Sequence, residues 1–406
     1  MQIDIYAIIK FISENKLGVG HFKKMYANET KIKQLATQIG FDIVKITDAK
    51  PFEKNEASAV ERVRSGLMDG LPWYSEERAI LSNHPKKLMQ DAESIISLAI
   101  CYNNSDKKHL GAGPHGKIAK YAWGDDYHEV IKQMLKTFVK ELQKTVDSQI
   151  KTRIFVDDGP MNDRAAAERS GLGWFGKNTN ILTSKHGSWV FLAQVITNLK
   201  LQIDKPVKKT CGECVMCIDA CPTNAIVAPY IIDNKKCISF LTIELRGSIP
   251  IEMRPLIGDW VFGCDICQDV CPVNIKVDIG TNQSFKQRTG FSAPQLIPLM
   301  YLTQSQFSEK FRNSPIKRAK YRGFLRNVCV ALGNIKDPQS IPTLTMALYH
   351  DESLVRSHAA WAIGNFNQKN YIPDLEAALK GETNSEVIEE IKLAINASTL
   401  KDRTQK

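Results

Sequence analysis

The chain has 406 residues, of which 43% are hydrophobic, and a formal net charge of +10. Its length exceeds that of a usual single domain, so two or three domains are expected. No apolar run reaches the roughly 18–20 residues of a membrane helix, and residues 1–24 lack the basic start of a signal peptide and a twin-arginine pair. We therefore expect a cytoplasmic protein without a membrane segment, and the positive charge favours a polyanionic partner.

Helix and strand patterns alternate over the first half of the chain, after an extension at residues 1–24. The predicted elements are, in chain order, a helix at 29–40, strands at 41–46 and 94–102, a helix at 127–147, a strand at 153–156, a short helix capped by Asn162 or Asp163, and a strand at 187–197. This alternation predicts one α/β domain over residues 25–204.

Eight of the ten cysteines lie between positions 211 and 271, within a segment rich in turns at 205–290. In "CGECVMCIDACP" (211–222), the spacing of Cys211, Cys214, Cys217 and Cys221 and the following proline are those of a bacterial ferredoxin. In that run the first three thiolates hold one 4Fe–4S cluster, and the fourth reaches a second cluster.

A second run, "GCDICQDVCP" (263–272), supplies the other half of such a pair. In a two-cluster ferredoxin, the last cysteine of each run binds the cluster of the other run. This predicts that Cys271 completes the first cluster with Cys211, Cys214 and Cys217. The second cluster then has Cys221, Cys264 and Cys267, and Cys237 is the one cysteine of the segment left to complete it. The alternative is a pair of structural zinc sites, which also use C-x2-C pairs.

The last part of the chain, residues 291–406, has helical patterns only. Leu332-Gly333-Asn334 recurs as Ile363-Gly364-Asn365, and Pro342 recurs as Pro373, 31 residues later in both cases. This period predicts a HEAT-like helical repeat, with an ordinary pair of helical hairpins as the alternative. Two units cannot bury both faces, so the repeat is expected to pack on the rest of the protein.

Other patterns carry less chemistry. "GAGPHG" (111–116) fits the glycine spacing of a dinucleotide fingerprint, but it lies too far beyond its strand and contains Pro114, so a loop is predicted. Cys101 and Cys329 lie in apolar stretches and are expected to be small buried residues.

Two clusters form an electron path, and each cluster passes one electron at a time. A two-electron reduction therefore needs a further redox centre.

The chain resembles the epoxyqueuosine reductase family over residues 28–400. The resemblance rests on "KIAKYAWGDDYHEV" (117–130), "VDDGPMNDRAAAERSGLGWFGKN" (156–178), "GSWVFLAQVITN" (187–198), the paired ferredoxin runs and the helical repeat. It implies a cobalamin-binding α/β domain, a ferredoxin-like domain with two 4Fe–4S clusters and a HEAT-like domain. The implied reaction is the last step of queuosine biosynthesis, the reduction of epoxyqueuosine to queuosine at the tRNA wobble position.

The resemblance also implies the partners and the site residues. Cobalamin would bind base-off, with no cobalt ligand from His128, and a small ferredoxin or flavodoxin would supply electrons to a monomer. Asp157 matches the general acid of the family; Asp158 beside it stands where the family has a small residue and remains an alternative, whereas Asp163 is expected to cap a helix. The residues expected to bind the corrin are Lys120, Asp157, Arg164, Lys177 and Asn178.

A basic stretch at 310–326, "KFRNSPIKRAKYRGFLR", has seven Lys or Arg residues and no acid. Such a stretch can neutralise phosphates and give salt-sensitive affinity for RNA, or it can be a solvated helix face. The predicted tRNA contacts are Lys317, Arg318, Lys320, Arg322 and Arg326.

Two other function classes remain open. A cobalamin-dependent reductive dehalogenase would share both kinds of cofactor, but dehalogenases of this kind usually carry a twin-arginine signal and have no use for a basic helical repeat. A ferredoxin-type electron-transfer protein would hold iron without cobalt. Cobalt content and tRNA binding separate the three.

Overall fold

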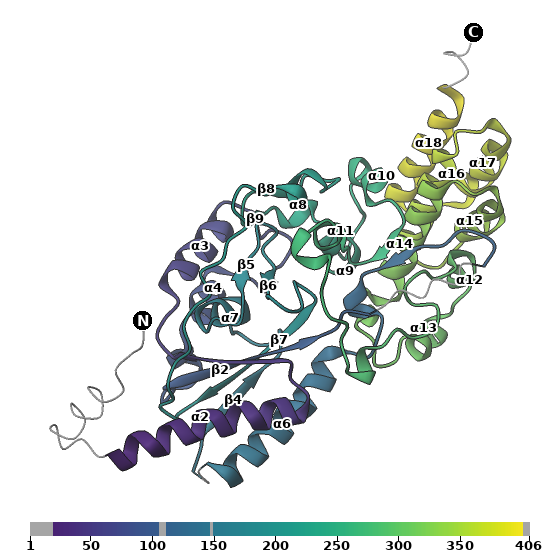
Figure 1. Ribbon diagram of the computed structural model, residues 1–406. Helices are drawn as coiled ribbons and strands as arrows, with labels where there is room; N and C mark the ends of the chain where they lie inside the picture. The colour runs from purple at the N-terminus through teal and green to yellow at the C-terminus, as the bar shows by residue number, and fades with distance from the viewer. Residues whose placement is uncertain (1–18, 105–110, 147–148, 401–406) are drawn as a thin grey trace.

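The computed structural model describes residues 19–104, 111–146 and 149–400 (Figure 1). Most of the predicted extension, residues 1–18, lies outside the described residues, and residue 19 already begins helix α2 (Val19–Ile39). Within the described ranges, no helix combines the length and the apolar character that crossing a membrane requires.

The first half of the chain is built on a four-stranded sheet. Its strands follow the order β1 (Ile43–Asp48), β2 (Ser94–Cys101), β7 (Val190–Thr197) and β4 (Thr152–Phe155). Every neighbouring pair is antiparallel. All four predicted strands are therefore confirmed, and the mixture of helices and strands matches the α/β expectation, with an antiparallel order throughout.

Helices cover both faces of this sheet. On one face, α2 and α6 (Tyr127–Thr145) lie side by side (Figure 1), and their apolar residues share a core with β2 and β7. On the other face, α7 (Asp163–Arg169) places Ala165 and Ala166 against Ile95 and Ile196. The small alanines allow this helix to approach the sheet closely, and they bring the loop after β4 over the sheet.

Shorter elements surround the sheet. They are α3 (Glu53–Arg64), α4 (Glu76–Ser82), α5 (Pro85–Leu88), β3 (Lys117–Ile118), η1 (Lys120–Ala122), β5 (Trp174–Phe175) and β6 (Ile181–Leu182). Residues 111–116 open no helix, as predicted. β3 pairs in parallel with β10 (Trp260–Phe262) of the cysteine-rich segment, which ties the two parts of the chain together.

The cysteine-rich segment consists of short elements. They are α8 (Met216–Asp219), β8 (Ile226–Ala228), β9 (Ile231–Ile232), η2 (Asn234–Lys236), α9 (Ile238–Ile243), η3 (Ile251–Met253), α10 (Arg254–Ile257), α11 (Ile266–Asp269), η4 (Pro272–Asn274) and η5 (Gln283–Phe285). α8 and α11 occupy equivalent positions in the two ferredoxin runs and contact each other.

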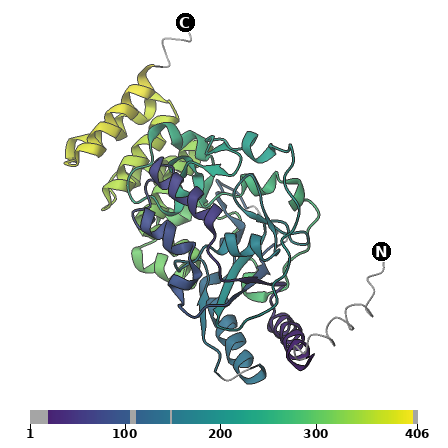
Figure 2. The ribbon, with the colours of Figure 1, turned by 90° about the vertical axis from the view of Figure 1, so that its left-hand side faces the viewer.

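The C-terminal part is helical. Its elements are α12 (Leu296–Met300), α13 (Gln304–Lys310), η6 (Pro315–Ala319), α14 (Lys320–Ile335), η7 (Pro338–Ser340), α15 (Ile341–Ala347), α16 (Ser353–Asn365), η8 (Lys369–Tyr371), α17 (Ile372–Gly381) and α18 (Ser385–Leu400). These helices, green to yellow, project from one end of the molecule (Figure 2).

The repeated Gly-Asn pairs explain how these helices stack. A Cβ on Gly333 would lie 2.8 Å from the Cα of Ala362, and one on Gly364 would lie 2.7 Å from the Cα of Ala394. Asn365 donates to the carbonyl of Gly333 at 2.8 Å, whereas Asn334 donates to carbonyls of α10 and its following turn. The cysteine-rich segment thus takes the place of a preceding repeat, and the repeat packs on the rest of the protein as expected.

Candidate functional site

The first group of thiols unites the two ferredoxin runs. Burial raises the pKa of Cys217, and the neighbouring Cys211, Cys271 and Cys214 raise it further. The pKa of Cys271 is raised by burial and by Cys211 and Cys214. The four cysteines predicted to hold the first cluster are therefore electrostatic neighbours, although Cys271 lies 54 residues beyond Cys217 in the sequence.

The second group consists of the other four predicted ligands. Burial raises the pKa of Cys264, and Cys237 and Cys221 add to the increase. Burial also raises the pKa of Cys267 well above its usual range, with further increases from Cys264 and Cys237. Cys237, proposed from the sequence by elimination, thus lies close enough to influence Cys264 and Cys267, and its role as a cluster ligand stays a prediction.

The cysteines form no disulfides. Among the residues that the structure describes, no set of three or more His, Cys, Asp or Glu side chains is arranged to hold a metal ion. The grouping therefore rests on mutual electrostatic influence rather than on a preformed ligand geometry. Two sets of four thiols are nevertheless the donors that two 4Fe–4S clusters require.

The two groups lie at different depths. Cys237 and Cys264 pack against a buried core that includes Phe240, Leu241 and Trp260. In the first group, by contrast, the run between Cys214 and Cys217 exposes Val215 and Met216. The first group is thus the one nearer to the protein surface.

Lys177 and Asn178 connect the sheet domain to the cysteine loops. The Lys177 Nζ donates to the carbonyl of Gly212 at 2.7 Å, and the Asn178 Nδ2 donates to the carbonyl of Cys267 at 3.1 Å. Each residue therefore holds the backbone of one ferredoxin run. The structure uses these donors within the protein, and a role in binding a corrin stays a prediction for both.

Lys120 and Arg164, two further predicted corrin contacts, differ in exposure. The Lys120 Nζ donates to the Asn103 Oδ1 at 3.0 Å and lies 4.2 Å from the ring centroid of Trp189. The exposed Arg164 donates to the carbonyl of Thr179 at 3.1 Å. His128 bonds through Nδ1 to the Oδ1 of Asp126 at the start of α6.

Asp157 lies two residues after the end of β4 and is exposed. Its backbone has a φ of 54°, in the left-handed region that a non-glycine residue rarely adopts. The Tyr127 hydroxyl donates to its Oδ2 at 2.7 Å. Such strain clusters at functional sites.

The other two aspartates of this loop have different surroundings. The carboxylate of Asp158 forms an ion pair with Lys132. Asn162, rather than Asp163, caps α7, because its side chain accepts from the Ala165 N–H at 3.1 Å. The carboxyl of Asp163 is instead buried, and its pKa is raised well above the usual range by that burial and by Asp157. The prediction of Asp163 as the helix cap is therefore wrong.

Tyr121 lies near both Asp157 and the second thiol group. It packs in one cluster with Cys237 and Cys264, and its ring centroid lies 6.2 Å from that of Tyr127, which donates to Asp157. Burial raises the pKa of Tyr121, and the carboxylates of Asp265 and Asp157 both add to the increase. Asp265 stands between Cys264 and Cys267 in the sequence, and its Oδ2 accepts from the Lys120 backbone N–H at 2.6 Å. The exposed aspartate and the deeper cysteines therefore flank one buried side chain.

The basic stretch reaches the same place. Lys317, Arg318, Lys320 and Arg322 are exposed. Arg318 forms a bidentate pair with Glu244, at 2.8 and 3.1 Å. The pKa of Arg318 is raised by Glu244 and, more weakly, by Tyr127 and Asp157, so this end of the basic stretch lies near the exposed aspartate.

Arg326 corrects one prediction. It was expected to contact tRNA, yet it is only 1% exposed. Its guanidinium donates to the carbonyls of Leu241, Leu245 and Gly247, all in or after α9. Because these bonds use it inside the protein, Arg326 is a structural residue rather than part of the basic surface.

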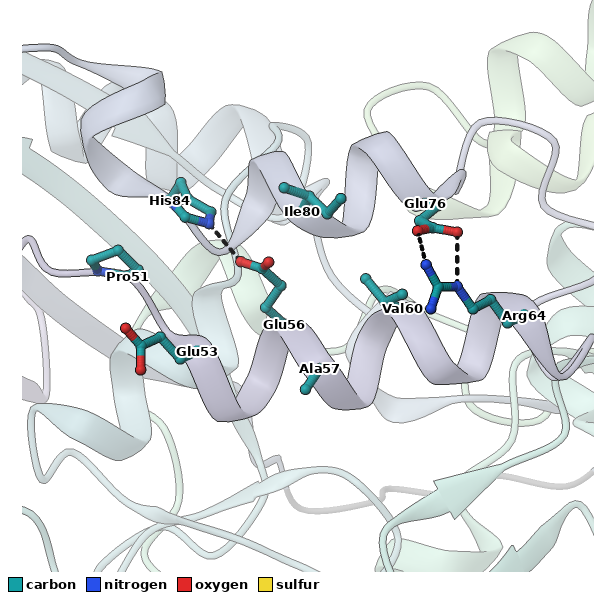
Figure 3. Close-up of a pocket in the computed structure, with 9 residues that line it drawn as sticks. All are labelled: Pro51, Glu53, Glu56, Ala57, Val60, Arg64, Glu76, Ile80 and His84. Carbon is teal, nitrogen blue, oxygen red and sulfur yellow. Dashed lines mark hydrogen bonds and ion pairs between the residues drawn. The ribbon is translucent and has the colours of Figure 1, made fainter.

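A groove between α3 and α4, with a volume of about 340 Å³, lies elsewhere (Figure 3). Two ion pairs cross it, His84 with Glu56 and Arg64 with Glu76. None of the predicted site residues lines this groove. The carboxylates of Glu56 and Glu76 are therefore already paired.

Three family models match the chain. Residues 83–158 match one described as epoxyqueuosine reductase QueG, residues 210–274 match a 4Fe-4S double cluster binding domain, and residues 321–396 match HEAT repeats. The last two matches confirm the iron–sulfur and HEAT predictions at the level of the family.

Curated relatives match most of the chain. The epoxyqueuosine reductase of Bacillus subtilis is 33% identical over 375 residues, which cover 91% of this chain and 96% of the relative. That of Escherichia coli is 37% identical over 338 residues, covering 82% and 88%. That of Cellulophaga algicola is 41% identical over 302 residues, covering 73% and 95%.

Solved structures agree with these relatives. An epoxyqueuosine reductase bound to an epoxyqueuosine-modified tRNA-Tyr stem loop is 33% identical and has a TM-score of 0.87, over 92% of this chain and 99% of the other. The Streptococcus thermophilus enzyme is 29% identical with a TM-score of 0.84, over 91% and 98%. In another structure of the Bacillus subtilis enzyme, 33% identical with a TM-score of 0.87 over 92% and 99%, a catalytic aspartate loop is swung out of the active site.

Proposed function

The chain belongs to the epoxyqueuosine reductase family, and we infer that it reduces epoxyqueuosine to queuosine at the wobble position of tRNA. It is an oxidoreductase. The observation that carries the inference for this chain is the position of Asp157, whose Oδ2 accepts from the Tyr127 hydroxyl and which lies near Arg318 and Tyr121. We propose that the acid, the electron route and the RNA-binding surface meet at this exposed residue.

The reaction defines what the site must supply. Converting an epoxide to an alkene consumes two electrons and two protons and releases the oxygen as water. As the carbon–oxygen bonds break, negative charge develops on the oxygen, and a nearby acid must protonate it. We propose Asp157 as this acid. Tyr127 holds its carboxyl group, and Asp158 is the weaker candidate because Lys132 already pairs with it.

We propose two 4Fe–4S clusters, with the thiols divided as the sequence predicted. The ligands of the first are Cys211, Cys214, Cys217 and Cys271, and those of the second are Cys221, Cys237, Cys264 and Cys267. The mutual influence within each set supports this division. We propose that the second set serves the reacting site, since Tyr121 packs in the same cluster as Cys237 and Cys264 and its ring centroid lies 6.2 Å from that of Tyr127, which binds Asp157.

We also propose that base-off cobalamin binds beside Asp157. When bound, it supplies a strongly reducing cobalt centre. Two of the predicted contacts fit the group chemically, because exposed Arg164 and the ammonium of Lys120 can donate to its amide and phosphate oxygens. Lys177 and Asn178 would support the site by fixing the cysteine loops.

The RNA partner would bind along the exposed basic residues. Lys317, Lys320 and Arg322 form no ion pair within the described residues, and Arg318 is close enough to Asp157 to feel its charge. Phosphates bound there would direct the anticodon loop toward the acid, and such loops present unstacked bases to proteins. Because the substrate is tRNA, we propose a cytoplasmic location.

Nucleoside mass spectrometry tests the function. In cells that lack this protein, tRNA should accumulate epoxyqueuosine and lose queuosine, and the intact gene should reverse both changes. The Asp157→Asn form should fail to do so while it retains iron and cobalt in the purified protein. Normal queuosine in the deletion strain, with no second reductase gene present, would contradict the proposal.

A further inference from the structure

Helix α4 holds the loop that carries Asp157. We call residues 157–162 the aspartate loop. The Nη2 of Arg78, in the middle of α4, donates to the carbonyl of Gly159 at 2.7 Å, across 81 residues of sequence. The backbone of Arg78 is itself fixed, because its N–H donates to the side chain of Ser75, the N-cap of α4. A guanidinium on a fixed helix therefore binds the backbone two residues after the proposed acid.

The far end of the aspartate loop is attached to the end of the same helix. The backbone N–H of Asn162 donates to the carbonyl of Ser82 at 3.0 Å, and the Asn162 Nδ2 donates to the Oδ1 of Asn83 at 2.9 Å. Asn83 is fully buried, so this attachment is fixed by the core. These contacts hold the end of the loop, and the Arg78 bond holds the part nearest to Asp157.

The span between β4 and Gly159 is short. A Cβ added to Gly159 would lie 2.3 Å from the Cδ1 of Phe155, the last residue of β4, so the loop lies directly against the strand that it leaves. The chain turns back within the residues between them, where Asp157 has its left-handed φ of 54°. Such a conformation persists only where the surrounding contacts determine it. Arg78 supplies one of these contacts.

Arg78 directs its charge to this carbonyl rather than to a carboxylate. Within the described residues its guanidinium forms no ion pair, and Glu76 of the same helix binds Arg64 instead. The Arg78 Cζ also lies 5.8 Å from the ring centroid of Trp73, within the range of a cation–π contact. Because a charged donor makes a stronger hydrogen bond than a neutral one, the bond to Gly159 is a firm one.

We propose that Arg78 is a positioning residue, which fixes Asp157 for proton transfer by holding the Gly159 carbonyl. This inference rests on the proposed function, in which Asp157 protonates the epoxide oxygen. Tyr127 binds the carboxyl group of Asp157, whereas Arg78 fixes the backbone that follows it. Both contacts act together, because movement of this backbone displaces the carboxyl group from the tyrosine and from the substrate.

Hydrogen–deuterium exchange of the holoenzyme, with no tRNA present, tests the contact itself. Arg78→Met keeps an unbranched side chain and removes its donors. Exchange in the peptide that covers residues 156–163 should then become about tenfold faster, because the loop opens more often. Arg78→Lys retains a charged donor and should restore part of the protection. The peptide of β7 should exchange at the wild-type rate in both variants, since the sheet stays intact.

Arg62→Met is the matched control for exchange. The Nη2 of Arg62, in α3, donates to the backbone carbonyl of Tyr230 at 2.8 Å. Its removal therefore also deletes a bond from a guanidinium to a backbone carbonyl, but at a site outside the aspartate loop. Exchange in residues 156–163 should stay at the wild-type rate in this variant.

Kinetics with an epoxyqueuosine-modified tRNA stem loop test the role in catalysis. We expect Arg78→Met to lower kcat about tenfold or more, as displacement of a catalytic group does, and to leave KM unchanged. Arg78→Lys should recover part of the kcat. A general loss of folded enzyme would instead lower the iron content and the exchange protection of β7 as well.

Three results would overturn the proposal. The first is wild-type exchange in residues 156–163 of Arg78→Met, because Arg78 would then not hold the loop. The second is an equal increase in the β7 peptide, which would assign the effect to the whole sheet. The third is faster loop exchange with an unchanged kcat. A wild-type enzyme without turnover would contradict the proposed function, and the exchange rates would still show whether Arg78 holds the aspartate loop.

Discussion

The hydroxyl of Tyr127 donates a hydrogen bond of 2.7 Å to Oδ2 of Asp157, across 30 residues of sequence. The tyrosine is rigid: its ring stacks on Phe191 with the centroids 4.3 Å apart and the planes 5° from parallel. Burial also raises the pKa of Tyr127 well above its usual range, so the phenol keeps its proton and stays a donor. An aspartate in a strained loop conformation is thereby held by a fixed partner.

The Tyr127→Phe variant tests whether the tyrosine hydroxyl positions Asp157, because the substitution should leave the fold intact. The phenylalanine keeps the ring stack and removes one hydrogen bond, so we expect kcat to fall about 10- to 100-fold, as misplacement of a catalytic group does. KM for a tRNA stem loop and the iron content should not change. Tyr371→Phe, in the C-terminal helices, is the control. A wild-type kcat for Tyr127→Phe would show that the hydroxyl does not position the acid.

Cys237→Ala should remove one cluster. Cys237 joins the second group through Cys221 and Cys264, and three thiolates hold a 4Fe–4S cluster less well than four. We expect roughly half of the iron to be lost, while the first cluster keeps its spectrum. Cys101→Ala removes a buried cysteine outside both groups and should retain all iron. Full iron in Cys237→Ala would reassign the ligand.

Reversing the exposed charges of the basic stretch should weaken RNA binding. We combine Lys317→Glu, Lys320→Glu and Arg322→Glu in one variant. A plot of log Kd against log salt should then have a slope smaller by about 2, because each lost phosphate contact lowers the slope by about 0.7. Arg326→Met should leave that slope unchanged and destabilise the fold by several kcal/mol, because buried carbonyls of α9 and its loop lose their donors. An unchanged slope in the triple variant would make the stretch a solvated face.

Arg326 also shows where sequence reasoning ends. Arg322 and Arg326 are one turn apart on α14, and nothing in the local pattern distinguishes them. The difference comes from a contact with the loop after α9, some 80 residues away, which covers only the second arginine. Strand positions could be predicted because hydrophobic periodicity is local, whereas burial of a charged residue depends on tertiary packing.

The same distinction applies around Asp157. A pattern of acids before an alanine-rich stretch predicts a helix cap, but it does not say which residue supplies it. Asn162 has the non-helical backbone of a cap, with φ at −85° and ψ at 83°, so Asp163 begins the helix itself and turns its carboxyl inward. Likewise, the sequence suggested ligand contacts for Lys177 and Asn178, and tertiary structure gives each a backbone carbonyl.

Gly364→Ala should loosen the helical repeat. The added Cβ would lie 2.7 Å from both the Cα and the Cβ of Ala394, so α16 and α18 must move apart. We expect a loss of about 1–3 kcal/mol in the free energy of unfolding, as for other overpacked sites. Gly323→Ala in α14 is the matched control, since nothing lies within 4 Å of its added Cβ. That variant should gain up to about 1 kcal/mol from helix propensity, so equal destabilisation of both would refute the steric argument.

Asp163 should make the stability of the fold depend on pH. Burial and the neighbouring Asp157 raise the pKa of its carboxyl, and Oδ1 has no hydrogen-bond partner among the described residues. The folded protein therefore keeps a proton that the unfolded chain releases above about pH 4. The stability linked to Asp163 is complete below that pH and is lost as the pH rises toward the folded pKa.

Asp163→Asn removes this titration with little change in shape. Its melting temperature relative to the wild type should therefore rise between pH 5 and pH 8, by an amount that corresponds to about 1–3 kcal/mol. Asp158→Asn, which removes an exposed carboxylate paired with Lys132, should not show such a rise. A melting-temperature difference that stays constant over this pH range would mean that Asp163 ionises as readily in the folded protein as in the unfolded chain.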